Sequence, residues 1–328
     1  MATTHPLAVA AARFKTAMRA TDRLIIDGHL AHKAVQARVD AACEALSDQM
    51  RVHLRGGAPD ANELGAFVHE ETYPYLGLST LVDRSYTKPR GYAGDYLTLQ
   101  MVYDDEPDGV RRLGPFIDRW FLDIAASRAV KNRRQLLREL IIDTAQQVCD
   151  DRPARITSLA CGPAREIFDI FTEPEHPDIV VTCLDIDDQA LDYAQRIAVD
   201  IGAQERVSFV RANAVKLALG RETLALRGQD LIYSIGLIDY LPDHLVIKLL
   251  DWIFRGLRLG GTAVVGNFDI DNPDKAFMDH LLDWRLIHRS PQDLVNLFAQ
   301  SEFATSAVEI RREATGVNLF ASARRTVR

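Results

Sequence analysis

Apolar residues recur at three- and four-residue spacing through the first 150 residues, which is the pattern of amphipathic helices. Breaks are expected at the Gly56-Gly57 pair and at Pro59. The N-terminal part is therefore expected to be an all-helical domain, which we place at residues 1–130. Its helices are predicted over residues 8–19, 30–54 and 61–76, and a further long helix over 114–148 leads into the second half.

From residue 156 the pattern changes to short apolar runs that alternate with helical stretches, such as 189–201 and 245–257. Such alternation predicts a parallel sheet with helices on both faces. The last two runs are joined by a turn through Thr315-Gly316, which predicts an antiparallel hairpin. We therefore expect an α/β domain over residues 131–328. Its strands are predicted at 156–160, 180–185, 207–212, 230–235, 262–268, 307–312 and 317–322.

Charge and hydropathy exclude several function classes. The 328 residues include 46 acidic and 39 basic side chains, so the net charge of -7 gives no general attraction to nucleic acid or anionic lipid. No apolar segment approaches the roughly 20 residues that span a bilayer, and no signal peptide is expected. One basic stretch alternates with apolar residues and is expected to form a solvated helix face: Arg111, Arg112, Arg119, Arg128, Lys131, Arg133, Arg134 and Arg138.

The four cysteines are scattered and form no C-x-x-C pair: Cys43, Cys149, Cys161 and Cys183. This usage predicts reduced thiols in the cytoplasm rather than disulfides or a zinc site, and no metal is expected.

The most informative turn follows the first predicted strand and reads SLACGPARE from Ser158 to Glu166. In open α/β sheets, ligands bind beyond the carboxyl ends of the strands. Small residues at Ala160, Gly162 and Ala164 would let a ligand approach the backbone closely. Asp185 ends the next strand, where its carboxylate is placed to accept hydrogen bonds from both hydroxyls of a ribose. The G-x-G-x-x-G pattern of dinucleotide-binding dehydrogenases is absent, which disfavours NAD.

A second distinctive segment, KPRGYAGDY, runs from Lys88 to Tyr96. It has two interpretations. In the first, it is a turn into a helix that Asp95 caps, with its tyrosines packed. In the second, it is a lid that projects Arg90 and the tyrosine hydroxyls over the cofactor and excludes water.

These features together resemble a known enzyme family. PRGYAGDY, the LACGPAxE turn and the LDWRLIHR stretch at 282–289 are similar to bacterial methyltransferases of extracellular-factor biosynthesis, which make 3-hydroxypalmitic acid methyl ester. The resemblance covers residues from about Thr72 to the C-terminus. It implies a class I methyltransferase fold, with a Rossmann-like seven-stranded sheet after the helical domain, and S-adenosyl-L-methionine as cofactor. Ser158, Ala160 and Ala164 replace the acid and two glycines of the usual acid-x-Gly-x-Gly-x-Gly motif, and His288 stands where a tyrosine is expected.

The resemblance also implies roles for particular residues. Either Arg90 or Arg289 is expected to hold the methionine carboxylate of the cofactor. The cofactor contacts are expected from Arg90, Ala160, Gly162, Asp185, Ile186, Asn213, Ala214 and Ser234. The expected catalytic residues are Tyr92, Tyr96, Asp239 and His288, and the expected substrate contacts are Tyr240, Trp284 and Arg289.

The methyl acceptor is expected to be the carboxylate of a small molecule, because a carboxylate is ionised at neutral pH and needs no general base. A nitrogen, sulfur or hydroxyl acceptor is the alternative, and it would require a base such as Asp239 or a histidine. A cofactor-binding module without turnover is a third interpretation. A nucleic acid partner is not expected, since the fourth strand ends in SIGL rather than in the Pro-Pro-aromatic motif used on flipped bases. A homodimer is left open.

Overall fold

The computed structural model describes residues 5–28, 30–54, 60–148 and 152–326. The predicted breaks at Gly56, Gly57 and Pro59, and also Cys149, lie outside these residues. The chain divides into two compact units, which we describe separately. The first unit comprises residues 1–128 and 272–285, and the second comprises residues 129–271 and 286–328. Nothing in the sequence pattern distinguished residues 272–285 as a segment of the helical unit.

The first unit is helical, as expected. Helix α2 packs against α1 and α6, and α12 packs against α2 and α3. Gly65 lies at this last contact, where a Cβ would come within 2.2 Å of the His280 ring, so only glycine fits there without rearrangement. The helices are α1 (Pro6–Ile26), α2 (His32–His53), α3 (Ala61–Leu76), α4 (Thr80–Thr87), α5 (Tyr96–Asp104), α6 (Gly114–Asp123) and α12 (Lys275–Leu281). None of the helices in the described part of the chain is long and apolar enough to cross a membrane.

The single helix predicted over 114–148 is wrong, because the structure has two helices there. Helix α6 ends at Asp123, and α7 (Ala125–Gln146) begins after Ile124, whose backbone is extended with ψ of 157°. The Asp274 carboxylate accepts a hydrogen bond of 2.8 Å from the Ala126 N–H, one of the unpaired donors at the start of α7. The apolar pattern continues across the break, so periodicity could not reveal it.

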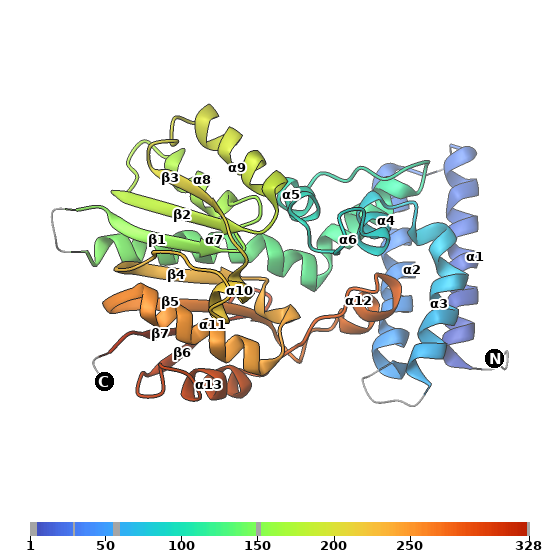
Figure 1. The fold of residues 1–328 in the computed structure, drawn as a ribbon. Coiled ribbons are helices and arrows are strands. Elements are labelled where there is room, and N and C mark those ends of the chain that lie inside the picture. The colour runs from blue at the N-terminus through green and yellow to red at the C-terminus, as the bar shows by residue number, and fades with distance from the viewer. Residues whose placement is uncertain (1–4, 29, 55–59, 149–151, 327–328) are drawn as a thin grey trace. The chain divides into compact units, whose positions relative to one another are not determined.

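The second unit is built on a seven-stranded sheet with the order β3-β2-β1-β4-β5-β7-β6 (Figure 1). The first five strands pair in parallel, whereas β7 is antiparallel to both β5 and β6. This order and the antiparallel hairpin confirm the expected class I methyltransferase fold. The strands are β1 (Ala154–Leu159), β2 (Ile179–Asp185), β3 (Val207–Arg211), β4 (Gln229–Ile235), β5 (Leu257–Phe268), β6 (Val308–Arg312) and β7 (Asn318–Arg324).

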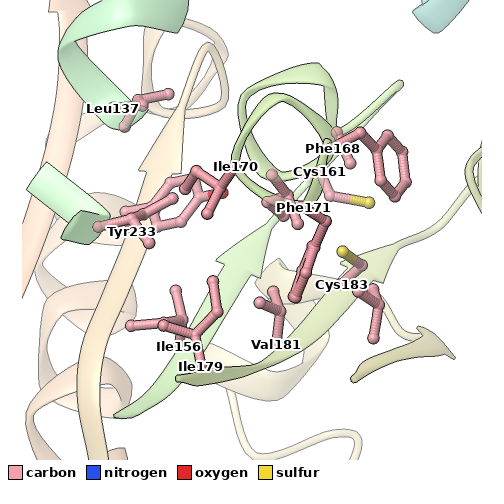
Figure 2. Close-up of a cluster of buried hydrophobic side chains, with 14 of the residues drawn as sticks. Leu137, Ile156, Cys161, Phe168, Ile170, Phe171, Ile179, Val181, Cys183 and Tyr233 are labelled. Atoms are coloured by element: carbon pink, nitrogen blue, oxygen red, sulfur yellow. The ribbon is translucent and has the colours of Figure 1, made fainter. Parts of the chain in front are cut away.

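Helices cover both faces of this sheet, which explains why its inner strands β1, β2 and β4 are largely buried. Helices α7, α8 (Arg165–Phe171) and α9 (Asp188–Asp200) pack on one face. Figure 2 shows part of this core, where Phe171 from α8 lies near Val181 of β2 and Ile170 lies near Tyr233 of β4. The other face is covered by α10 (Ala214–Ala218), α11 (Asp243–Gly256) and α13 (Pro291–Ala299).

Cysteine thiols contribute to the cores of both units. Cys43, Cys161 and Cys183 are free and buried. The Cys183 thiol and burial together raise the pKa of Cys161 well above its usual value. A buried thiol of this kind is an unreactive packing group rather than a nucleophile.

One buried carboxylate joins the strands at the end of the sheet where β1 and β4 begin. Asp230, 2% exposed, accepts hydrogen bonds from both Nη atoms of Arg152 at 2.8 and 3.0 Å and from the Arg155 N–H at 2.8 Å, and it also pairs with Arg258. Burial alone would raise the pKa of Asp230, but these donors outweigh it and lower the pKa to about 2.

We expect Asp230→Asn to lower the free energy of unfolding at pH 7 by about 2 kcal/mol, because it removes this favoured ionisation. A lowered pKa stabilises the fold fully above the ordinary aspartate pKa of about 3.9, and the stabilisation is lost as pH falls toward about 2. Urea unfolding between pH 7 and pH 3 should show the difference from the native protein shrinking below about pH 4. Asp178→Asn, at an exposed pair with Arg206, is the control and should change stability by under about 0.5 kcal/mol. A pH-independent difference would contradict the ionic explanation.

Candidate functional site

The turn between β1 and α8 has an unusual backbone. Ala160, Gly162 and Ala164 all adopt the left-handed conformation, with φ of 53°, 54° and 50°. These are the three positions at which the usual class I motif has glycine. A left-handed alanine costs about 1–2 kcal/mol, so this turn keeps the geometry of a glycine turn at a cost in stability. The small residues leave the backbone open to close approach at the carboxyl end of β1.

Asp185 fixes this turn to the end of β2. One carboxylate oxygen accepts a 2.9 Å hydrogen bond from the Gly162 N–H, and the other accepts a 2.9 Å bond from the Asp187 N–H. Burial raises the pKa of Asp185, and the two backbone donors oppose that shift. Since a carboxylate oxygen has more than one acceptor position, each can still receive a hydroxyl proton.

A cavity of about 260 Å³ lies beyond the ends of β2 and β3 and is lined by Ile186, the residue after Asp185, and by Arg211, Ala212, Asn213, Lys216 and Glu222. Ile186 contributes an apolar side chain that is 56% exposed. Asn213 caps α10 by accepting a 3.0 Å bond from the Lys216 N–H, and its own N–H donates to Glu222 at 3.2 Å. The structure thus brings the expected residues Ile186 and Asn213 to one cavity, and Ala214 follows as the first residue of α10.

Ser234, another of the expected cofactor contacts, uses its hydroxyl within the sheet. Ser234 is fully buried in β4, and its hydroxyl donates to the Leu159 carbonyl of β1 at 3.2 Å. The hydroxyl therefore tightens the β1–β4 pair. The strand ends at Ile235, and the next residue, Gly236, has φ of +88° and borders the buried guanidinium of Arg133: a Cβ at Gly236 would lie 3.2 Å from Arg133 Nη1.

Asp239 follows in the short helix η1 (Ile238–Tyr240) and is 1% exposed. Its carboxylate accepts a 2.7 Å bond from the Phe268 N–H of β5. Burial raises the pKa of Asp239 to about 6, although the Phe268 N–H and the nearby Arg133 act in the opposite direction. Tyr240, next in the chain, is 41% exposed.

Arg289 is a structural residue, which corrects its expected role on a ligand carboxylate. All five of its N–H groups donate within the protein, so none is left for a ligand. The acceptors are the carbonyls of Ile238 and Leu241, the Asn267 side chain and the Asp243 carboxylate. Arg289 therefore holds the segment that carries Asp239.

His288 lies next to this buried arginine. Its Nδ1 is 3.1 Å from the Leu286 carbonyl oxygen. Its ring packs edge-to-face with the Phe268 ring, with 5.9 Å between the ring centroids. The neighbouring Ile287 N–H donates to the Asp239 carbonyl at 2.7 Å. The structure thus places His288 and Asp239, both expected catalytic residues, on adjoining segments.

The remaining expected residues belong to the first unit. Asp95 caps α5 by accepting from the Leu97 and Thr98 N–H groups, and Arg84 Nη2 donates to both of its carboxylate oxygens at 2.7 and 2.8 Å. Tyr96 is 7% exposed, with the Arg90 guanidinium 5.0 Å above its ring. The capped-turn interpretation therefore describes Asp95 and Tyr96.

Tyr92, in contrast, is 40% exposed. Trp284 is half-buried, and its backbone N–H donates to the Met278 carbonyl. The adjacent Asp283 pairs with Lys88 at 2.6 Å, so this unit joins the two segments that the sequence singled out.

Sequence reasoning missed three buried polar residues near the turn. Arg133 is 5% exposed, so its assignment to a solvated helix face is wrong. Glu166, in the first turn of α8, accepts a 2.7 Å bond from the buried Tyr233 hydroxyl. Burial raises the pKa of Glu166, and the Tyr233 bond and the charge of Arg133 oppose it.

A signal for Arg133 was present in the sequence. Val130, Leu137 and Ile141 are buried, and Arg133 lies in the same stripe at three- and four-residue spacing. A cation within an apolar stripe indicates a buried charge that must be paired.

The geometry suits a nucleoside ligand, since a fixed carboxylate, an open backbone turn and an adjoining cavity meet at the carboxyl ends of β1, β2 and β3. Residues 90–266 match the sequence profile of a family described as "Putative methyltransferase". The match includes Gly162, Asp185 and Asp239, and it covers more than half of the chain. The protein belongs to this methyltransferase family.

Similar folds occur among solved structures. A protein from Bordetella parapertussis described as a possible exported protein is 21% identical and has a TM-score of 0.63, with 92% of this chain and 99% of that chain covered. Magnesium protoporphyrin IX methyltransferase from Synechocystis, solved with bound S-adenosylmethionine, is 10% identical with a TM-score of 0.48, over 75% of this chain and 96% of that chain. At 21% identity the likeness to the Bordetella protein concerns the fold alone. Among curated proteins, none matches the methyltransferase.

We expect Ala160→Gly to raise the free energy of unfolding by up to about 1 kcal/mol. Relief of the left-handed strain, about 1–2 kcal/mol, exceeds the cost of about 0.5–1 kcal/mol for a more flexible unfolded chain. Ala164→Gly is the matched comparison, because it relieves similar strain but removes a fully buried methyl group worth about 0.8 kcal/mol. Urea unfolding should therefore rank Ala160→Gly above Ala164→Gly. Equal destabilisation by both changes would show that the turn is unstrained.

Proposed function

We propose that this methyltransferase takes its methyl group from S-adenosyl-L-methionine and transfers it to a carboxylate oxygen of a small molecule, such as a fatty or hydroxy acid. The observation that carries the proposal is the Asp185 carboxylate, held by the Gly162 and Asp187 N–H groups beside the cavity of Ile186 and Asn213. When bound, S-adenosyl-L-methionine supplies an electrophilic methyl group on its sulfonium sulfur.

In this proposal the residues of the second unit bind and orient the cofactor. Asp185 accepts hydrogen bonds from the ribose hydroxyls, while Ile186, Asn213 and Ala214 border the adenine. The open backbone at Ala160 and Gly162 permits close approach of the ligand. Alignment of the acceptor and exclusion of water then provide most of the rate enhancement.

Residues of the first unit enter the proposal from the sequence alone. Arg90, Tyr92, Tyr96 and Trp284 are proposed to contact ligand because they lie in the two segments that resemble extracellular-factor methyltransferases. A signalling ester such as 3-hydroxypalmitic acid methyl ester is the product that this resemblance favours. We also propose that the protein is cytoplasmic, that it forms a homodimer and that it has no nucleic acid partner.

One observation favours the second candidate acceptor, a hydroxyl, amine or thiol. Asp239 has a pKa raised to about 6, which is close to that of an effective general base at neutral pH. In that reaction Asp239 or the adjoining His288 would accept the proton of the acceptor, and Tyr240 would contact the substrate. A carboxylate acceptor would leave Asp239 with a positioning role.

The acceptor is tested by incubating the protein with methyl-labelled S-adenosyl-L-methionine and matched fatty acids, 3-hydroxy acids, fatty amines and fatty alcohols. We expect label in the acids, as esters that mild base hydrolyses, because only an ester releases its methyl group under those conditions. Base-stable label in amines or alcohols would establish the second candidate. Cofactor binding with no labelled product from any acceptor or cell extract would favour a module without turnover.

We expect Asp185→Ala to weaken binding of S-adenosylhomocysteine at least about tenfold, because two charge-assisted hydrogen bonds to the ribose are lost. Isothermal calorimetry measures the affinity directly. Asp178→Ala, which removes an exposed aspartate just before β2, is the control and should bind as the native protein does. Unchanged affinity in Asp185→Ala would refute the ribose assignment.

A further inference from the structure

Arg133 is a buried cation at the ligand-binding end of the sheet. It projects from α7 and is 5% exposed, yet it lies beside Gly236, directly beyond the carboxyl end of β4. A guanidinium with so little exposure is costly unless anions and acceptors surround it. Because Arg133 is buried, it does not serve to keep the surface soluble, and its position near the proposed ligand site has another cause.

Two buried carboxylates are close enough to feel this charge. Burial raises the pKa of Glu166, at the start of α8, and that of Asp239, in η1, and the charge of Arg133 opposes the rise at both carboxylates. The Tyr233 hydroxyl holds Glu166 at 2.7 Å, and the Phe268 N–H holds Asp239 at 2.7 Å. Arg133 thus lies among fixed groups at the ends of β1 and β4, and its own orientation is correspondingly constrained.

The position also fits the extent of the cofactor. Asp185 ends β2, and β1 separates β2 from β4 in the sheet. Two strand spacings are about 10 Å, which the aliphatic chain of a methionine part can span from a ribose at Asp185. Gly236, with φ of +88° and no Cβ, lets the guanidinium lie close to the end of β4, where a Cβ would come within 3.2 Å of Arg133 Nη1.

We propose that Arg133 binds the carboxylate of the amino-acid end of the methyl donor. This inference rests on the proposed use of S-adenosyl-L-methionine and assigns the opposite end of that ligand from Asp185. Arginine suits the task because its planar donors match both oxygens of a carboxylate. Arg289, one of the two arginines that the sequence suggested for this anion, has all its donors committed within the protein, and the other, Arg90, belongs to the first unit.

The test compares S-adenosylhomocysteine with its decarboxylated analogue, which differs only by the carboxylate, in isothermal calorimetry. The native protein should bind S-adenosylhomocysteine about 10- to 100-fold more tightly, the range expected for charge-assisted hydrogen bonds. In Arg133→Met this ratio should fall to within about twofold of unity, because the group that recognises the carboxylate is gone. Arg133→Lys, which keeps the charge but loses the planar donors, should give an intermediate ratio.

This ratio of affinities distinguishes loss of carboxylate recognition from damage to the fold, because damage to the fold weakens the binding of both ligands alike. Arg138→Met removes another arginine of α7, one paired with Glu173 at the surface, and should leave the ratio at its native value. A native-sized ratio in Arg133→Met would overturn the inference while leaving the cofactor proposal intact. Failure of the native protein to bind S-adenosylhomocysteine at all would overturn both.

Discussion

The Asp185 carboxylate joins the turns that follow β1 and β2, and it adds to the backbone bond from the Cys161 N–H to the Leu184 carbonyl. It receives the Gly162 N–H from the turn after β1 and the Asp187 N–H from the turn after β2. The β1 turn contains three left-handed residues, two of them alanines, so it needs support from outside itself. The cavity lined by Ile186 and Asn213 begins directly after Asp185, and the order of the whole ligand-binding edge depends on this one side chain.

Most of the α/β fold was predictable from the sequence because its signals are local. Each predicted strand agrees with an observed strand to within a few residues, and the Thr315-Gly316 turn forms with φ of +77° at Gly316. The motif positions Gly162 and Asp185 were also recognisable, since a turn after one strand and an acid after the next occupy fixed places in a parallel sheet. Short apolar strands that alternate with helices are compatible with few folds other than a parallel sheet covered by helices.

Side-chain partners were less predictable, because they depend on distant segments. The Ser234 hydroxyl donates to the Leu159 carbonyl, and Arg289 donates to acceptors from two separate segments, 238–243 and β5, so both side chains use their donors within the protein. Arg133 was misassigned for the opposite reason: a cation in a basic helix suggested solvent, although its neighbours in the stripe are buried. The interruption of the long helix at Ile124 depends on Asp274, which is remote in sequence.

Residues 272–285 lead the chain back into the helical unit, and this limits how the protein can be divided into two parts. The polypeptide passes between the two units three times, after residues 128, 271 and 285. No single cut in the chain can therefore separate the two units. A deletion of the N-terminal helices would leave α12 without α2 and α3, the helices against which it packs. Evolutionary exchange of the helical unit would likewise demand two coordinated replacements rather than one fusion event.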